Sequence, residues 1–475
     1  MNEIINKLKI DTNNETDIIY REKKIKNETI YIIYNESLTG NDQISDFIIR
    51  SLDSISYRYE KNNNLYKEII NNINNFKVKE ITTYKDICYY LNNGFTIIIF
   101  ENSKYLALET KKELSRSISP PSTETTLRGS LDSFIEEIQT NVGLVRRRIK
   151  DNNLWTINND IGTYTKTKTT ILYINGICKK ELVNKVDKSL KEIDIDGITA
   201  SGNIKNLIEK ENKSVFPTII TTQRPDKVAK ALLRGKIAIL VDGSPYAIIL
   251  PSVLNDFFLS AEDPYGKSIN VSFTRIIRYI AFFISLLTPA LYIAITTFNQ
   301  EILPTDLLIN IASQRESVPF PAFFETLIMI ISFEILRESD LRIPSFSSSA
   351  LSIVGALILG EAAVNAGLVS PIMIIVVSLT AISALPFTEP EIINGIRWYR
   401  LFFMLGATTL GIVGVMLTLI CFLIKLSNLK SFGIPYLTPL APTFKEGLKN
   451  SIIKFPIKKL KKREPYLSNN LNKEA

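Results

Sequence analysis

The sequence predicts an α+β cytoplasmic region of two small α/β subdomains, followed by an α-helical multi-pass membrane domain. Three observations lead to this fold class. Strands and helices alternate in the polar first half, several long apolar runs follow in the second half, and a strongly basic tail comes after the last run. Because about 20 apolar residues cross the hydrocarbon core as a helix, the runs predict membrane spans.

The predicted organisation has five parts. They are a low-complexity polar segment (1–40), a first α/β subdomain (41–155), a second α/β subdomain (156–270), a membrane domain of four to five spans (271–428) and a basic cytoplasmic tail (429–475). A chain of 475 residues is long enough for several units of ordinary domain size. The two subdomains are expected to be related to each other.

Each subdomain is predicted to contain a β-hairpin. The paired strands are 95–100 with 105–110 in the first, and 237–241 with 246–250 in the second. The second hairpin turns at Asp242-Gly243, a strong turn signal. Residues 169–174 predict a further strand, and 225–234 predict a helix that begins with proline and is followed by Gly235.

An arginine-rich helix is predicted between the hairpins. Apolar residues recur at a spacing of three to four from Leu131 to Ile149, which predicts a helix that begins near Ser130. Its carboxyl end carries cations, which suit the helix dipole. The end is either solvated or in contact with a subunit carboxylate or lipid headgroups. The contact candidates are Arg128, Arg146, Arg147 and Arg148.

Five apolar runs are candidate spans. They are residues 279–298, 321–336, 350–369, 372–387 and 401–424. The tail is rich in Lys and Arg, and the amino terminus has no signal-peptide core, so both ends are predicted to be cytoplasmic. That topology requires an even number of spans. Either the stretch 360–371 is therefore re-entrant, or one run lies on the membrane interface.

One apolar run contains an ionisable residue. A carboxylate costs about 2.5–3.5 kcal/mol or more at the bilayer centre, so Glu361 is predicted to face a bundle interior or a watery path. Glu361 from several subunits would form an acidic ring that favours cations. Asn365 lies on the same run, and Val364 and Gly367 are candidates for a close-packed gate.

Two further carboxylates lie in a shorter apolar run. Glu325 and Glu334 are both near the ends of residues 321–336, where a carboxylate can reach the membrane interface. The alternative prediction is that either carboxylate lines the polar pathway.

The composition excludes several classes of protein. The chain has no histidine, which excludes histidine-based catalytic triads and the commonest metal ligand. Cys88, Cys178 and Cys421 are scattered singly, so neither a disulfide framework nor a zinc site is indicated. No phosphate loop or nucleophile motif occurs. The net charge of +8 comes largely from a tail that suits an anionic leaflet. We therefore expect that the protein is not an enzyme and that it binds no cofactor, metal or nucleic acid.

Several segments together resemble a known family. They are Glu124, Arg128-Gly129, Phe134, Asn141, Arg146–Ile149, Arg224–Asp226, Gly235–Gly243, Glu262-Asp263, Arg315–Pro321, Glu325, Glu334–Glu338, Ile353–Ala356, Gly360–Val364, Ala366–Pro371 and Gly433–Tyr436. From about residue 40 to 440 the chain is similar to the A subunit of the GerA family of spore germination receptors. It departs from that family at Ser130, where proline is usual, and at Leu131–Ser133.

The resemblance implies a multi-pass protein of the spore inner membrane within a nutrient-responsive receptor. Its partners would be a transporter-like B subunit that senses the nutrient, a C-subunit lipoprotein, further copies of itself and membrane lipid. We expect a ligand-gated monovalent cation channel that starts germination. The alternatives are a secondary transporter, for which only one interrupted region is evident, and a non-conducting membrane scaffold of the germination complex.

Overall fold

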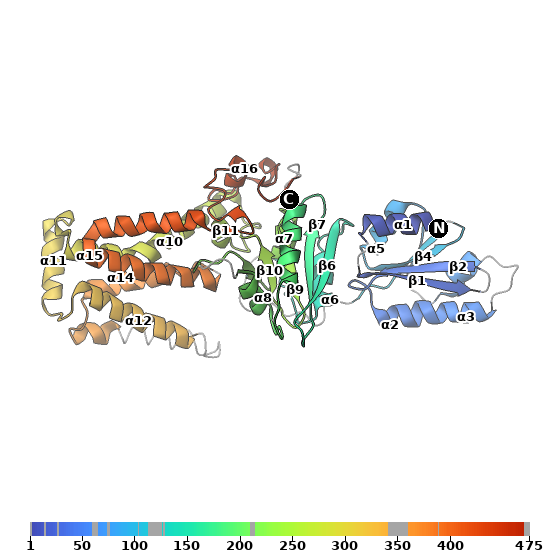
Figure 1. Cartoon of the computed structure of the whole chain (residues 1–475), viewed down its shortest axis with the longest axis horizontal. Coiled ribbons are helices and arrows are strands. Elements are labelled where there is room, and N and C mark those ends of the chain that lie inside the picture. The colour runs from blue at the N-terminus through green and yellow to red at the C-terminus, as the bar shows by residue number, and fades with distance from the viewer. Residues whose placement is uncertain are drawn as a thin grey trace.

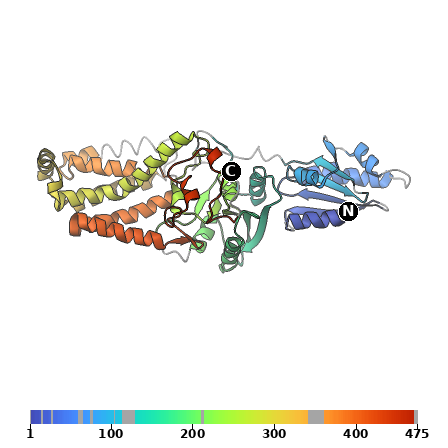
Figure 2. The ribbon, with the colours of Figure 1, turned by 90° about the horizontal axis from the view of Figure 1, so that it is seen from above.

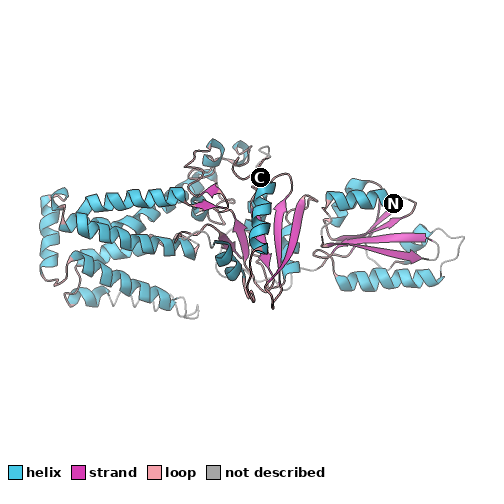
Figure 3. Cartoon of the chain, in the orientation of Figure 1, coloured by secondary structure: helices cyan, strands magenta, loops and turns pink. Residues whose placement is uncertain are grey.

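The structure is a computed structural model that describes residues 2–13, 16–25, 28–58, 65–73, 77–102, 104–112, 126, 129–209, 214–340, 360–387 and 389–469. Three parts follow one another along its long axis: a first α/β unit, a second α/β unit and a helical domain (Figure 1). The strands of the described residues belong to the two units and to one short hairpin beside the helical domain (Figure 3).

The first unit is a five-stranded antiparallel sheet with helices on both faces. Its strands are β1 (Ile18–Ile25), β2 (Glu28–Asn35), β3 (Val78–Ile81), β4 (Phe95–Phe100) and β5 (Tyr105–Glu109). Its helices are α1 (Asn2–Asp11), α2 (Asn41–Gln43) continuing through a π-helical turn (Ile44–Ile49) into α3 (Arg50–Arg58), α4 (Leu65–Asn72) and α5 (Tyr84–Leu91). Successive side chains of a strand point to opposite faces, so Ile97 and Ile98 enter different cores. This explains why β4 is apolar throughout.

The second unit repeats the topology of the first. Its strands are β6 (Leu154–Ile161), β7 (Thr167–Ile174), β8 (Ile220–Thr222), β9 (Ile237–Val241) and β10 (Ala247–Leu250). Its helices are α6 (Ile138–Arg146), α7 (Lys180–Lys191), α8 (Ser201–Ile208) and α9 (Pro225–Leu233). The sheet orders are β1-β2-β4-β5-β3 and β6-β7-β9-β10-β8, so corresponding strands occupy the same places. The predicted hairpins, the strand at 169–174 and the helix at 225–234 are confirmed.

Two predicted boundaries differ from the units in the structure. The segment 1–40 is not separate, because β1 and β2 pair with each other and β2 pairs with β4. The second unit begins before α6 and not at residue 156, because α6 packs in the core that also contains β7 and β9. The polar bias of the amino terminus concealed its strands, since β1 buries few side chains.

The arginine-rich helix begins later than predicted. Its helical bonds start at Ile138, while Leu131 is 62% exposed. Before Ile138 the backbone forms hydrogen bonds outside any helix. The Phe134 amide donates to the Gln223 carbonyl. The side chain of Asn141 accepts a bond from the Ile135 amide and donates one to the Ile135 carbonyl. A segment whose amides are satisfied in this way cannot also form the ladder of a helix.

The helical domain begins after a 3₁₀ turn (Leu254–Phe258). Its helices are α10 (Ser268–Thr297), α11 (Thr305–Glu316), α12 (Ala322–Asp340), α14 (Pro371–Ile382) and α15 (Pro390–Asn428), with a 3₁₀ turn (Gln300–Ile302) before α11. Among the described residues, α10 and α15 are long and apolar enough to cross a membrane. We call the end where α11 lies, farthest from the second unit, the distal end (Figure 1).

α15 is a helical hairpin and not one straight span. Gly411 has φ +58° and ψ −137°, a backbone conformation that interrupts the helix. The rings of Tyr399 and Phe422 lie 4.7 Å apart, whereas 23 residues of straight helix would separate them by about 34 Å. The predicted span 401–424 is therefore wrong as a single crossing. Hydropathy detects an apolar run but does not detect a turn within it.

The carboxyl-terminal segment folds back onto the second unit (Figure 2). It contains β11 (Lys430–Ser431), β12 (Ile434–Pro435), α16 (Lys445–Leu448) and a 3₁₀ turn (Ile457–Lys459). Ser431 donates to the Thr218 carbonyl, and Ser468 donates to the Ile177 carbonyl. The expected tail is thus a folded part of the protein, although Lys461 and Lys462 remain exposed on it.

Candidate functional site in the helical domain

The predicted pathway segment forms a tight hairpin with α14. Residues 360–365 are helical, and the chain reverses at Gly367, whose φ of +67° suits glycine. A Cβ atom at Gly360 would lie 3.6 Å from Ile374 of α14, which is ordinary contact. A Cβ at Gly367 would meet the Ser317 carbonyl at 3.5 Å, so this hairpin turns at the distal end, beside α11.

The candidate pathway residues divide between two environments. Glu361 and Asn365 are exposed and lie one helical turn apart, whereas Val364 is half-buried and packs against the apolar core. Within the part of the chain that the structure describes, Glu361 has no hydrogen-bond or ion-pair partner. A carboxylate and an amide therefore form a polar stripe on the outside of an otherwise apolar bundle.

Glu325 joins α12 to this hairpin. Its side chain is fully buried, and its Oε1 atom accepts hydrogen bonds from the Ser370 amide at 2.7 Å and the Ser370 hydroxyl at 2.6 Å. Ser370 is the residue that precedes α14, so the carboxylate binds the positive end of that helix. The carboxylate of Glu325 is therefore bonded inside the bundle and is not exposed on its surface.

The second oxygen of Glu325 lies in an incompletely bonded polar group. The Oε2 atom of Glu325, the Nε atom of Arg315 and the hydroxyl of Tyr292 are all buried without a hydrogen-bond partner. Oε2 and Nε are 3.9 Å apart. These atoms are too far apart for a good direct bond, and a gap of this kind suits a bridging water.

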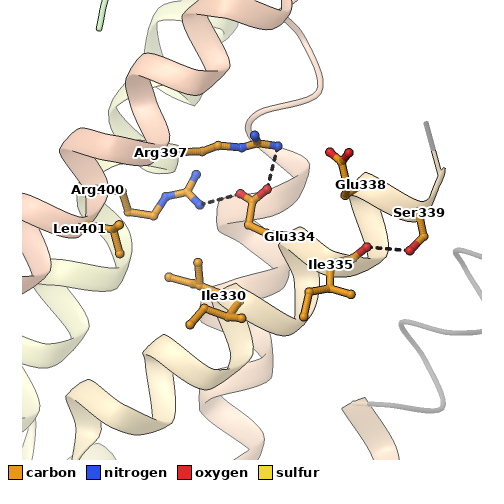
Figure 4. A pocket seen from close by; sticks show the side chains of 9 residues that line it. Ile330, Glu334, Ile335, Glu338, Ser339, Arg397, Arg400 and Leu401 are labelled. Carbon is orange, nitrogen blue, oxygen red and sulfur yellow. Dashed lines mark hydrogen bonds and ion pairs between the residues drawn. The ribbon is translucent and has the colours of Figure 1, made fainter. Parts of the chain in front are cut away.

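Glu334 lies in a different environment from that of Glu361. It faces Arg397 and Arg400 of α15 across a pocket of about 390 Å³ (Figure 4). Its carboxylate lies 2.7 Å from Arg397 and 3.9 Å from Arg400. The rest of the pocket is largely isoleucine and leucine, from Ile330 to Leu401. The structure therefore gives Glu334 a place in an ion-pair network between α12 and α15.

Arg400 also provides a hydrogen bond to a carbonyl group of α10 that a proline leaves without a helical partner. A proline has no amide hydrogen, so Pro289 leaves the carbonyl of Ser285, four residues earlier, without its helical donor. The Nε atom of Arg400 donates to that carbonyl at 2.9 Å. Both groups are buried. Arg400 thus joins α10, α12 and α15, and the sequence signal for this role was a proline within an apolar run.

The arginines at the end of α6 form ion pairs mainly with carboxylates of the same chain. Arg146 forms a buried ion pair with Asp17 of the first unit at 2.8 Å. Arg148 binds Asp132 at 2.6 Å. Arg147 is exposed, and Arg128 lies outside the described residues. Of the predicted external contacts, only Arg147 is seen with its side chain in solvent.

A buried charge cluster, not predicted from the sequence, fixes the base of α10. Asp263 binds Arg275 at 2.8 Å and Arg278 at 3.0 Å. Arg275 also donates to the Ser451 carbonyl, and Lys454 donates to the Asp263 carbonyl. The second unit, α10 and the carboxyl-terminal segment are therefore joined at one point. The family pattern named Asp263, but its partners follow it by 12 to 191 residues.

No group of three or more acidic or cysteine side chains is arranged to hold a metal within the described ranges. The site is instead a set of carboxylates in an apolar bundle. Its described charges are paired, with Glu361 as the exception noted above.

Comparisons with known proteins agree with one another. Residues 6–466 match the family model for the Bacillus/Clostridium GerA spore germination protein. The chain is 40% identical to spore germination protein KA of Bacillus subtilis (strain 168), over 94% of this chain and 83% of that protein. It is 34% identical to spore germination protein GerLA of Bacillus cereus, over 98% and 95% of the two chains.

One solved structure is also similar. It is the crystal structure of the N-terminal domain of the A subunit of the Bacillus megaterium spore germinant receptor GerK3, with 33% identity and a TM-score of 0.42. The match covers 53% of this chain and 94% of that one. From the family model and the curated relatives, this chain belongs to the GerA family of spore germination receptor A subunits.

Proposed function

We propose that this chain lies in the spore inner membrane through its helical domain, with both α/β units and both termini on the cytoplasmic side. Arg275 and Arg278 lie at the proximal end of α10, and Lys425 lies at the end of α15 on the same side. Cations concentrated at one end of the spans favour a cytoplasmic location for that end.

The hairpin in α15 supports an even number of crossings. α10 leaves the second unit at its base, and the last turn of α15 returns there, since Phe216 contacts Phe422. A chain that enters and leaves the bundle on one side must cross an even number of times. The two limbs of α15 supply the extra crossing that the hydropathy pattern lacked.

Several copies of the chain would line a path for monovalent cations. The observation that carries this proposal is the exposed Glu361 on the outside of an apolar bundle, where no described residue pairs with it. In lipid a carboxylate of this kind is strongly unfavourable, so water or another subunit must face it. A ring of such carboxylates attracts cations, as in other cation channels. Val364 and Gly367, one to two turns further along, would form the closed gate.

Ligand binding to a partner would shift the gate between its states. The proposed partners are a transporter-like B subunit and a C-subunit lipoprotein, as the family resemblance implies. A partner changes this equilibrium only if its contacts differ between the closed and open states. Glu325 offers such a connection, because it ties α12 to the hairpin that contains Glu361.

Conductance of the purified protein in lipid vesicles tests the proposal. Glu361→Gln should lower the preference for potassium over chloride, because it removes one charge per subunit from the path. Glu316→Gln is the matched control, since Glu316 is exposed at the end of α11. Unchanged selectivity would refute the ring. Saturating flux at low turnover would favour a transporter, and no conductance from the intact oligomer would favour a scaffold.

A further inference from the structure

A small cavity lies at the junction between the second unit and the helical domain. Its volume is about 130 Å³, and it lies between α9 and the segment 259–265, which leads into α10. The charged residues that line it are Asp226, Lys227, Lys230, Arg234, Lys236 and Asp256. Cations therefore outnumber carboxylates in its wall.

Most of these charges are neutralised by a partner. The ion pairs are Asp226 with Arg224, Lys227 with Glu389, Arg234 with Asp256 and Glu464, and Lys236 with Asp256. Asp226 also accepts a hydrogen bond from Tyr265 at 2.8 Å. The two carboxylates of the wall are thus already occupied, and neither is available to another cation.

Lys230 is the exception. Its amine has no ion-pair or hydrogen-bond partner anywhere in the described ranges of the chain. Burial, together with the positive charges of Arg234, Arg275 and Lys454, lowers the pKa of Lys230 to about 8, whereas Asp263 acts in the opposite direction. Lys230 is half-buried, and an unpaired amine that faces other cations is stabilised when an anion is placed beside it.

We propose that this cavity is a binding site for a compact oxyanion, a carboxylate or a phosphate group, held by Lys230. Drug-sized ligands occupy pockets of about 300–1,000 Å³, so this cavity accommodates only a small group. Charge-assisted hydrogen bonds from an ammonium to such an oxyanion are about twice as strong as neutral ones. The anion would supply the charge that the wall lacks.

The position of the cavity gives the anion a route to the helical domain. The segment 259–265 that lines the cavity contains Asp263, which binds Arg275 and Arg278 at the base of α10. An occupant that orders this segment would therefore stabilise the attachment of α10. The regulatory meaning of this connection rests on the proposed function, but anion binding itself does not depend on conduction.

Thermal unfolding of the full-length protein in detergent tests the site. Inorganic phosphate and acetate are the probes, with chloride at the same ionic strength as the reference. A ligand that binds only the folded state raises the Tm. We expect Lys230→Met to weaken the apparent affinity about tenfold or more. Lys188→Met, at an exposed lysine on α7, should bind like the natural protein.

Amine labelling of the natural protein provides a measurement that needs no variant. Phosphate or acetate should slow acetylation of Lys230 by acetic anhydride, read by peptide mass spectrometry, and leave Lys188 unchanged. Protection by phosphatidylglycerol micelles, but not by free phosphate, would assign the oxyanion to a lipid headgroup. Equal labelling of Lys230 with and without every probe would overturn the site, whatever the conductance results.

Discussion

The contact between the two limbs of α15 gives the sharpest prediction. A Cβ atom at Gly414 would lie 1.9 Å from the carbonyl oxygen of Gly406 and 2.6 Å from its carbonyl carbon. Non-bonded atoms prefer roughly 3.5–4.0 Å, so Gly414→Ala must push the limbs apart by about 1.5 Å or more. The obstacle is backbone, which cannot rotate away. Overpacking of this kind costs about 1–3 kcal/mol.

The assay is thermal unfolding of the purified full-length protein in detergent. Gly414→Ala should lower the Tm by a few degrees. Gly360→Ala is the matched control, because its Cβ would meet only the Ile374 side chain at an ordinary 3.6 Å. If both variants melt at the natural temperature, the limbs do not pack through glycine and this reasoning fails.

A cross-link tests the same hairpin without changing its packing glycines. Tyr399→Cys and Phe422→Cys, made together in a chain where Cys421 is serine, should be joined within one chain by a short bis-maleimide reagent. Their rings are 4.7 Å apart in the hairpin. In a straight helix these positions would be about 34 Å apart and could not join. Two separately capped cysteines, with no intramolecular cross-link, would show that α15 is one rod.

Three further outcomes follow from single side chains. Arg146→Met should cost about 3–5 kcal/mol of unfolding free energy, because it leaves the buried Asp17 carboxylate without its partner, and adding Asp17→Asn should recover most of the loss in denaturant titrations. Arg400→Leu should cost about 1–3 kcal/mol in the same assay, because the buried Ser285 carbonyl loses its donor, whereas no loss would show that another group satisfies it. Lys230→Met should raise the stability at pH 7 by at most about 3 kcal/mol, because the pKa of Lys230 is about 8 in the folded chain against an ordinary 10.5. The unfolded chain binds that proton more tightly, so the stability of the natural protein rises between pH 8 and 10.5. The stability advantage of Lys230→Met should disappear over the same pH range. An advantage that stays constant with pH would contradict the lowered pKa.

The elements predicted correctly are those that short-range patterns determine. The second hairpin has apolar strands around an Asp-Gly turn, and α9 is delimited by Pro225 and Gly235. Both signals act within a few residues, so they can be read from the sequence. The shared topology of the two units could be suspected from this repetition, but strand order depends on pairing between distant segments.

The errors arose where distant groups decide the structure. Residues 130–137 follow a helical apolar pattern, yet Gln223 and Asn141 bond to their backbone. The run 401–424 satisfies every hydropathy test, yet Gly411 turns it. A local pattern cannot report a bond to a residue far along the chain.

The candidate site was predicted in part. Glu361 was identified from its chemistry alone, and the structure places it on an exposed face. Arg146 was expected either to be solvated or to contact another subunit or lipid, but its partner is Asp17 in the same chain. A run of arginines indicates that carboxylates lie nearby but does not identify them. The partner here precedes Arg146 by 129 residues, so no local pattern connects the two.

Phe216 couples the second unit to both limbs of α15. Its ring is 98% hidden from solvent and packs against both limbs, 5.4 Å from the ring of Tyr399 and 5.7 Å from that of Phe422. It also fills the space beside Gly395, where a Cβ would approach to 3.2 Å. Tilting the second unit would therefore press this ring against both limbs at once, so a small rotation of the unit would change the packing of the hairpin.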